Sequence, residues 1–174
     1  MKTINLRLSS GGIREAIKEL RQYQSDVERK VTVLVRALMS EGENHVAAYI
    51  AKNVSATGEL LRSVNSEMSN DRLGLVKVNN QYAVYVEFGT GIVGATNPHP
   101  DVAILGWRYD INGHGNLGWW YPADSTDLNP TNHQTSSGTW IAWTKGIPSR
   151  PFMYDAAQRL RSEVVPLAKG VFNV

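Results

Sequence analysis

The side chains best suited to chemistry in this 174-residue chain are its histidines and carboxylates, since it has no cysteine. The absence of cysteine excludes disulfides, thiol nucleophiles and cysteine-ligated zinc. Three histidines and two aspartates gather in one loop-rich stretch, but none has the His-x-x-x-His spacing of a helical zinc site. We interpret them as loop residues that hydrogen-bond or face solvent, and predict no metal: His99, Asp101, Asp110, His114 and His133.

A glycine-containing motif at residues 87–91 (Glu-Phe-Gly-Thr-Gly) could suggest a phosphate-binding loop. It lacks the Gly-Lys-Ser/Thr ending of such a loop, and it follows an expected strand instead of opening a helix. We expect Phe88 in the core and Glu87 pairing with a basic group or capping, the alternative being that Glu87 contacts a neighbouring subunit. No Gly-x-Ser-x-Gly elbow or triad signature is present, and His45 is typical of a helix surface or core. The sequence therefore predicts no enzyme and no cofactor.

All five tryptophans fall within residues 92–146, a stretch rich in Gly, Asn, Pro and Thr. Segments 117–122 and 139–144 predict a hairpin there. Adjacent residues of a strand point to opposite faces, so the tryptophans cannot all share one face. They pack on the protein's own body, on a neighbouring subunit or on a carbohydrate. We take them as the candidate assembly interface: Trp107, Trp119, Trp120, Trp140 and Trp143.

Composition indicates a folded protein, with 42% hydrophobic and 20% charged residues and a net charge of +2. The length suits a single domain, 1–174. No apolar run is long enough to span a membrane, and the N-terminus lacks the pattern of a secretory signal. The nearly balanced charge argues against nucleic-acid binding through phosphates, so no sequence-specific nucleic-acid partner is expected.

The first third of the chain predicts mostly helix. Residues 4–8 alternate as a short strand. Apolar residues at helical spacing then predict a helix over 13–24 and a long one over 26–52, separated by a capping box that starts at Ser25. Gly42 lowers helix propensity, so a bend is expected there.

Period-two alternation follows, with turn-forming pairs at Asn70-Asp71 and Asn79-Asn80 that tolerate positive φ. The pattern predicts an antiparallel meander of three strands, 62–69, 73–79 and 82–88.

The chain closes with a helix over 152–164, which Pro166 ends or kinks. The fold class is therefore α+β. We expect the long N-terminal helix and the C-terminal helix to pack on the meander, with residues 92–146 as an elaborated insertion.

Three stretches in this order, 57–63, 82–91 and 148–157, resemble the tail-completion or neck proteins of long-tailed bacteriophages, often described only as minor tail components. The family pattern is a Thr-Gly-x-Leu turn, a strand ending in Glu-Phe-Gly-Thr, and Pro-Phe-Met before a helix. Its matched positions here are Thr57, Gly58, Leu60, Glu87, Phe88, Gly89, Thr90, Pro151 and Phe152.

The resemblance implies helices packed on an antiparallel sheet and a structural role at the head–tail junction of a virion. It implies a homo-oligomeric ring, six- or twelve-fold, whose lumen can pass DNA. The implied partners are connector, neck and tail-tube proteins, assembled after synthesis in the host cytoplasm. No cofactor and no membrane partner are implied, and the role of residues 92–146 is least covered.

Two other functions remain open from the residues alone. The tryptophan cluster could serve a carbohydrate- or cell-wall-binding module, because aromatic platforms bind sugars. The loop histidines could serve a small metal-dependent hydrolase. Binding to polysaccharide would favour the first of these, and a stoichiometric metal would favour the second.

Overall fold

The computed structural model describes residues 9–54 and 58–173, and they form two compact units. The first holds residues up to His45, Asn65–Lys77 and everything from Ala157 onward, and the second holds Val46–Val64 and Val78–Ala156. The expected strand 4–8 lies outside the described residues, and the single-domain assignment stays a prediction. No helix in the described part of the chain combines the length and hydropathy needed to cross a bilayer.

One helix, α1 (Ser10–Asn53), replaces the two that the sequence predicts over 13–24 and 26–52. Ser9 caps it, because its side-chain oxygen accepts a hydrogen bond from the Gly12 amide at 3.1 Å. The predicted break at Ser25 is wrong. The apolar spacing continues through Ser25 without a phase shift, so an uninterrupted helix keeps one apolar face, whereas a new cap would break its hydrogen bonds.

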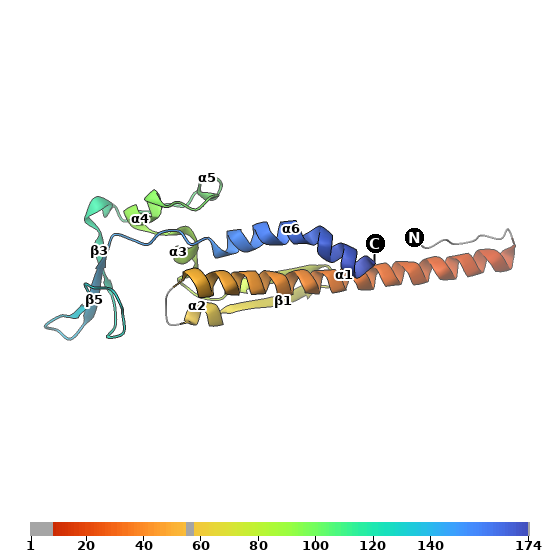
Figure 1. Ribbon diagram of the computed structural model, residues 1–174, viewed down its shortest axis with the longest axis horizontal. Coiled ribbons are helices and arrows are strands. Elements are labelled where there is room, and N and C mark those ends of the chain that lie inside the picture. Colours follow the sequence, from red (N-terminus) through yellow and green to blue (C-terminus); the bar gives the residue numbers. More distant parts are fainter. Residues whose placement is uncertain (1–8, 55–57, 174) are drawn as a thin grey trace. The chain divides into compact units, whose positions relative to one another are not determined.

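In the first unit, α6 (Phe152–Phe172) and a two-stranded hairpin pack along α1 (Figure 1). Gly42 allows this close packing: a Cβ there would lie 2.9 Å from Leu160 Cδ1 and 3.1 Å from Val76 Cγ2. The helix continues through Gly42, so its role is a close approach of elements. Polar contacts join the same elements, with Ser66 donating to Glu43 at 2.6 Å and Lys30 to the Phe172 carbonyl at 3.5 Å.

The hairpin comprises β1 (Val64–Asn70) and β2 (Leu73–Val78), close to the predicted strands 62–69 and 73–79. Its turn does not use positive φ, which in the described residues other than glycine occurs only at Asn173. Instead the Asn70 side chain accepts a hydrogen bond from the Arg72 amide at 2.9 Å, which is a local Asx turn.

The third predicted strand, 82–88, is wrong: these residues form helix α3 (Ala83–Phe88). Asn80 starts the helix, because its side chain accepts a hydrogen bond from the Tyr82 amide and its carbonyl one from the Ala83 amide. The buried residues are Ala83, Val86 and Glu87, which is helical spacing. A short apolar run fits either period, and here the turn chemistry decides between them.

The C-terminal helix α6 also runs beyond its predicted end at 164, with Pro166 inside it. Pro166 therefore does not end the helix. Figure 1 shows the axis of α6 changing direction in its C-terminal part, as expected where proline removes a backbone hydrogen bond.

The second unit carries the short elements. Its helices are α2 (Glu59–Arg62), α3, α4 (Gly91–Thr96) and α5 (Val102–Leu105), with a 3-10 turn η1 (Gly115–Leu117). Its sheet has strand order β3-β5-β4, formed by β3 (Trp119–Pro122), β4 (His133–Gln134) and β5 (Trp140–Thr144). The core of the unit includes Val46, Ile50, Leu60, Phe152 and Ala156.

Strands β3 and β5 pair antiparallel, as predicted for segments 117–122 and 139–144, and β4 adds a third strand on the other side of β5. The α+β class is confirmed, with the long N-terminal helix packed on the C-terminal helix beside small antiparallel sheets.

Candidate assembly site

Glu87 caps the N-terminus of α6 from a buried position. Its carboxylate accepts hydrogen bonds from the Met153 amide at 2.9 Å and the Tyr154 amide at 3.0 Å. These amides belong to the first turn of the helix, which has no intrahelical partners for them and favours negative charge. The expectation that Glu87 caps within its own subunit is met, although the partner helix lies more than sixty residues away in sequence.

His99 completes the bonding of Glu87, with its Nε2 3.1 Å from the carboxylate, and both side chains are almost fully buried. The other ring nitrogen, Nδ1, accepts a hydrogen bond from the Asp101 amide at 3.0 Å. Nδ1 therefore carries no proton, and Nε2–H donates to Glu87 from a neutral imidazole. Neither group is placed to meet a substrate.

Phe88 lies against this pair on an aromatic stack. Its ring centroid is 4.5 Å from that of His99 and 5.0 Å from that of Trp107. The Trp107 indole N–H donates to the Gly89 carbonyl at 3.0 Å. Phe88 is only half-buried, so it is a less complete core residue than the sequence suggested.

Gly89 allows the second and third motif stretches to meet. Its φ is 78°, and a Cβ there would lie 2.6 Å from the Ser149 backbone nitrogen. Only glycine combines that dihedral with that approach. The two stretches are joined by Ser149 donating to the Glu87 carbonyl at 2.6 Å and by the Arg150 amide donating to the Val86 carbonyl at 2.9 Å.

Thr90 extends the same junction. Its amide donates to the Ile147 carbonyl at 2.9 Å, and its hydroxyl accepts from the Ile147 amide at 3.2 Å. We call these two hydrogen bonds the Thr90–Ile147 clasp. It brings together the two ends of the insertion at 92–146.

The remaining motif residues are structural. Pro151 precedes α6, and Phe152, its first residue, is 1% exposed. Leu60 of the first stretch is equally buried, and Gly58 adopts φ 77° before α2. Thr57 lies outside the described residues.

The tryptophans of the insertion divide between the two faces of the β3-β5-β4 sheet. Trp120 pairs with Trp143 across the strands, while Trp119 pairs with Thr144 on the opposite face. Trp140 pairs with Gln134 and shares the face of Trp119, because residues 140 and 143 differ in parity. The predicted division between faces is therefore confirmed.

The two faces differ in cover. Trp119 stacks on His114, with ring centroids 4.9 Å apart, and lies against the backbone of Gly91. Trp120 on the other face is 53% exposed and meets only the edge of His133. We call the face that carries Trp120 and Trp143 the open tryptophan face.

Beside this face lies an open hollow of about 470 Å³. Trp107, Trp119 and Trp120 contribute to its lining, together with Tyr85 and Asp110. The Asp110 carboxylate is already used: it accepts hydrogen bonds from the Gly115 and His114 amides, and these hold its pKa below the ordinary value.

Three other groups have shifted pKa values with structural causes. Burial raises the pKa of Tyr49, and the nearby carboxylates of Asp155 and Glu87 raise it further. Burial and a hydrogen bond to Asp127 raise the pKa of Tyr121. Hydrogen bonds from Thr126 lower that of Asp124. Each of these groups has its partner within the protein's own loops and helix ends.

The histidines and aspartates that the sequence brought to attention do not converge. His99 bonds to Glu87, His114 lies 3.5 Å from Asp110, and His133 Nδ1 lies 2.9 Å from the Thr131 carbonyl.

The described residues do contain one cluster of metal-ligating types that the sequence did not suggest, formed by Glu41, His45 and Glu163. Its potential ligand atoms lie within 4.8 Å of one another, and His45 Nε2 already contacts both Glu163 oxygens, at 2.9 and 3.0 Å. Glu41 and His45 are four residues apart on α1, which was visible in the sequence, but the third member depends on the packing of α6.

Comparison with known proteins gives one family. Residues 18–89 match the family described as "Bacteriophage HK97-gp10, putative tail-component". The match spans the first two motif stretches and ends before the third. No curated protein and no solved structure matches the chain. In residues 18–89 the chain carries the sequence of the HK97-gp10-like family of phage tail components, so the family predicted from its motifs is confirmed.

Proposed function

We propose that the protein is a non-enzymatic structural subunit of a tailed-phage particle, and that copies of it form a ring at the head–tail junction. The family match to phage tail components carries the proposal. A closed ring joins one patch of each copy to a different patch of the next. Connector, neck and tail-tube proteins are the neighbouring partners, and DNA passes through the lumen.

The use of the polar groups supports a structural role. The buried Glu87 accepts three hydrogen bonds, two from the end of α6 and one from His99. A general base needs a lone pair directed at a substrate, and this carboxylate spends its bonding on a helix and a histidine.

The open tryptophan face supports an assembly contact. Tryptophan is enriched at the centres of protein interfaces, and exposed rings with few neighbouring charges are costly to leave in water. Residues 92–146 contain only two basic and four acidic residues, and Trp120 is 53% exposed. We infer that another protein surface covers this face in the particle.

A deletion confined to the sheet tests this inference. Because Trp119 and Thr144 are cross-strand partners, their neighbours Gly118 and Lys145 can be joined by a two-residue Asn-Gly turn. The deletion retains Trp107 on Phe88 and His99 on Glu87. We expect a folded protein by circular dichroism that fails to enter particles when it complements a phage lacking the protein.

A point variant adds a matched control. Trp120→Arg should reduce particle incorporation, whereas Leu128→Arg, at an 88% exposed position in the same insertion, should not. Normal yields of infectious particles from both the sheet deletion and Trp120→Arg would contradict the assembly role of this face.

Carbohydrate binding is the second candidate, favoured by the tryptophan-lined hollow. Retention on cell-wall polysaccharide that is lost in Trp120→Ala would favour it. The engagement of Asp110 by its own loop argues against it, because sugar sites need free polar groups beside the rings.

A further inference from the structure

The first turns of α1 carry an apolar stripe that is open to solvent. Ile13, Ile17 and Leu20 are 45%, 44% and 53% exposed. The same stripe continues through Val31 and Leu34, which are half-buried in the first unit. Single exposed apolar residues are ordinary, but a row of three on one helix face is a contact surface.

The spacing of the stripe indicates what kind of surface covers it. Its positions alternate steps of four and three over eight residues, Ile13, Ile17, Leu20, Gln24, Val27, Val31, Leu34 and Leu38. This is the seam of a coiled coil, with a period of 3.5, whereas a helix lying on a globular core shows a wider apolar face. The expected occupant of the exposed part is therefore another helix.

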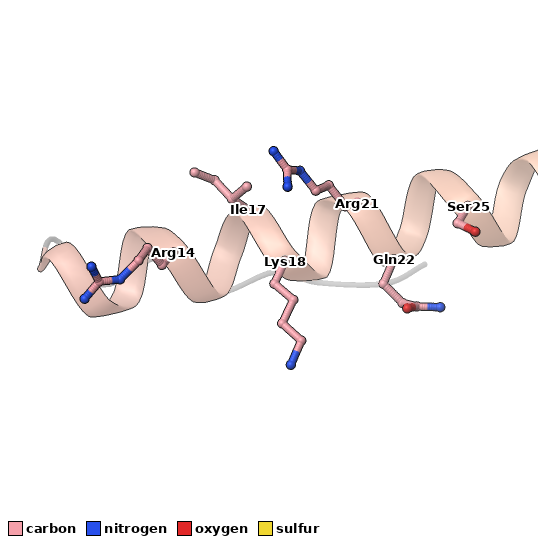
Figure 2. Close-up of a pocket in the computed structure, with 6 residues that line it drawn as sticks. All are labelled: Arg14, Ile17, Lys18, Arg21, Gln22 and Ser25. Carbon is pink, nitrogen blue, oxygen red and sulfur yellow. The ribbon is translucent and has the colours of Figure 1, made fainter.

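The flanks of the stripe carry opposite charges. Arg14, Lys18 and Arg21 lie on one side, and Glu19 and Asp26 on the other. In Figure 2, Ile17 and Arg21 project from one side of the helix, and Lys18 and Gln22 from the other. Asp26 is 3.5 Å from Arg29 on the same helix, in an exposed pair of little strength.

These charges distinguish the orientations of two identical helices. In a parallel pair the basic flank of each helix lies against the acidic flank of the other, as at the e and g positions of coiled coils. In an antiparallel pair the basic flanks meet each other, which is unfavourable. A polar residue within the seam, here Gln24, also favours one register over others.

We infer that residues 10–27 of α1 associate with the same residues of a second copy as a parallel, in-register coiled coil. The inference rests on the proposed ring-forming function and names one of its self-contacts. The exposed seam is about 27 Å long at 1.5 Å per residue. Such a short coiled coil is weak alone, so the other contacts of the assembly reinforce it.

Single cysteines test the orientation, since the native chain has none. In a parallel, in-register pair, each seam residue faces its own copy within disulfide range. Ile13→Cys and Gln24→Cys should therefore both form disulfide-linked dimers on oxidation of the concentrated protein. These positions are about 16 Å apart along the helix, so an antiparallel pair could link only one of them. Gln22→Cys, on the outer side, is the control and should stay monomeric.

Three outcomes overturn the inference: neither seam variant cross-links, only one does, or Gln22→Cys cross-links as readily. As a second measurement, Leu20→Lys should lower the association constant in sedimentation at least tenfold, while Gln22→Lys leaves it unchanged. A wild-type protein that shows no association would also overturn it. Particle incorporation separates the two proposals: if Leu20→Lys enters particles at the normal yield, the ring function stands and this contact fails.

Discussion

At the scale of single residues, Glu87 connects parts of the chain that are far apart in sequence. It accepts hydrogen bonds from the first turn of α6 and from His99, all within the second unit. The sequence indicated capping or pairing but could not name the partners, because buried hydrogen bonds between distant segments leave no local pattern.

Glu87→Gln should lower the free energy of unfolding by about 1–3 kcal/mol, because its amide group turns a donor toward a donor. The exposed Glu59→Gln, in the same unit, is the control and should change it by less than about 0.5 kcal/mol. Urea denaturation measures both. Equal effects would show that the buried contacts of Glu87 contribute nothing special.

The two phenylalanines of the motifs should differ in their contribution to stability. Phe152 is 1% exposed, so Phe152→Ala should cost about 3–5 kcal/mol. Phe88 is half-buried on Trp107, and Phe88→Ala should cost clearly less. Thermal melts of the two variants provide the comparison. A larger loss for Phe88→Ala would contradict this ranking.

The Asp110 loop should persist under mildly acidic conditions. The Gly115 and His114 amides lower the pKa of Asp110 below the 3.8 of an ordinary aspartate. A carboxyl with a depressed pKa stabilises the folded loop above its unfolded pKa, and this contribution is lost as pH falls through the folded pKa. The amide NMR signals of His114 and Gly115 should therefore titrate below 3.8, and Asp110→Asn should remove that titration.

At the scale of elements, sequence periodicity predicted well wherever the pattern was long. The helical spacing of α1, the strands β1 and β2 and the β3–β5 pairing were all recognisable. The six-residue α3 was mistaken for a strand because Tyr82, Val84, Val86 and Phe88 alternate. In so short a run the Asx turn at Asn80 outweighs the alternation.

Gly42 should be intolerant of substitution although alanine favours helix. A Cβ would lie 2.9 Å from Leu160 Cδ1 and 3.1 Å from Val76 Cγ2, so Gly42→Ala must displace α6 or β2 side chains. We expect a loss of about 1–3 kcal/mol from overpacking. Gly170→Ala in α6 has nothing within 4 Å and should be neutral or stabilising. A stabilising Gly42→Ala in chemical denaturation would refute the packing argument.

At the scale of the whole molecule, the chain crosses between its two units four times, after His45, Val64, Lys77 and Ala156. Both α1 and α6 continue across such a crossing. Neither unit can therefore be isolated by one cut, and each shares its long helices with the other. This interweaving could not be predicted from the sequence, which shows no linker because there is none.

Shared helices should make unfolding a single cooperative transition. All five tryptophans lie in the second unit, so their fluorescence reports on that unit, whereas circular dichroism at 222 nm reports mainly on α1 and α6. We expect the two signals to melt with the same midpoint, as a single domain does. Separate midpoints would show two domains that unfold independently.

The Thr90–Ile147 clasp has a consequence for how this chain can change over time. It fixes the entry and exit of the insertion beside each other, so the frame experiences only a closed junction. The entropy of closing a loop rises only with the logarithm of its length. A stem of this kind can accept grafts of different size and surface chemistry. Related subunits could thus exchange the segment between residues 91 and 146 as a cassette while the helices that hold it keep their sequence.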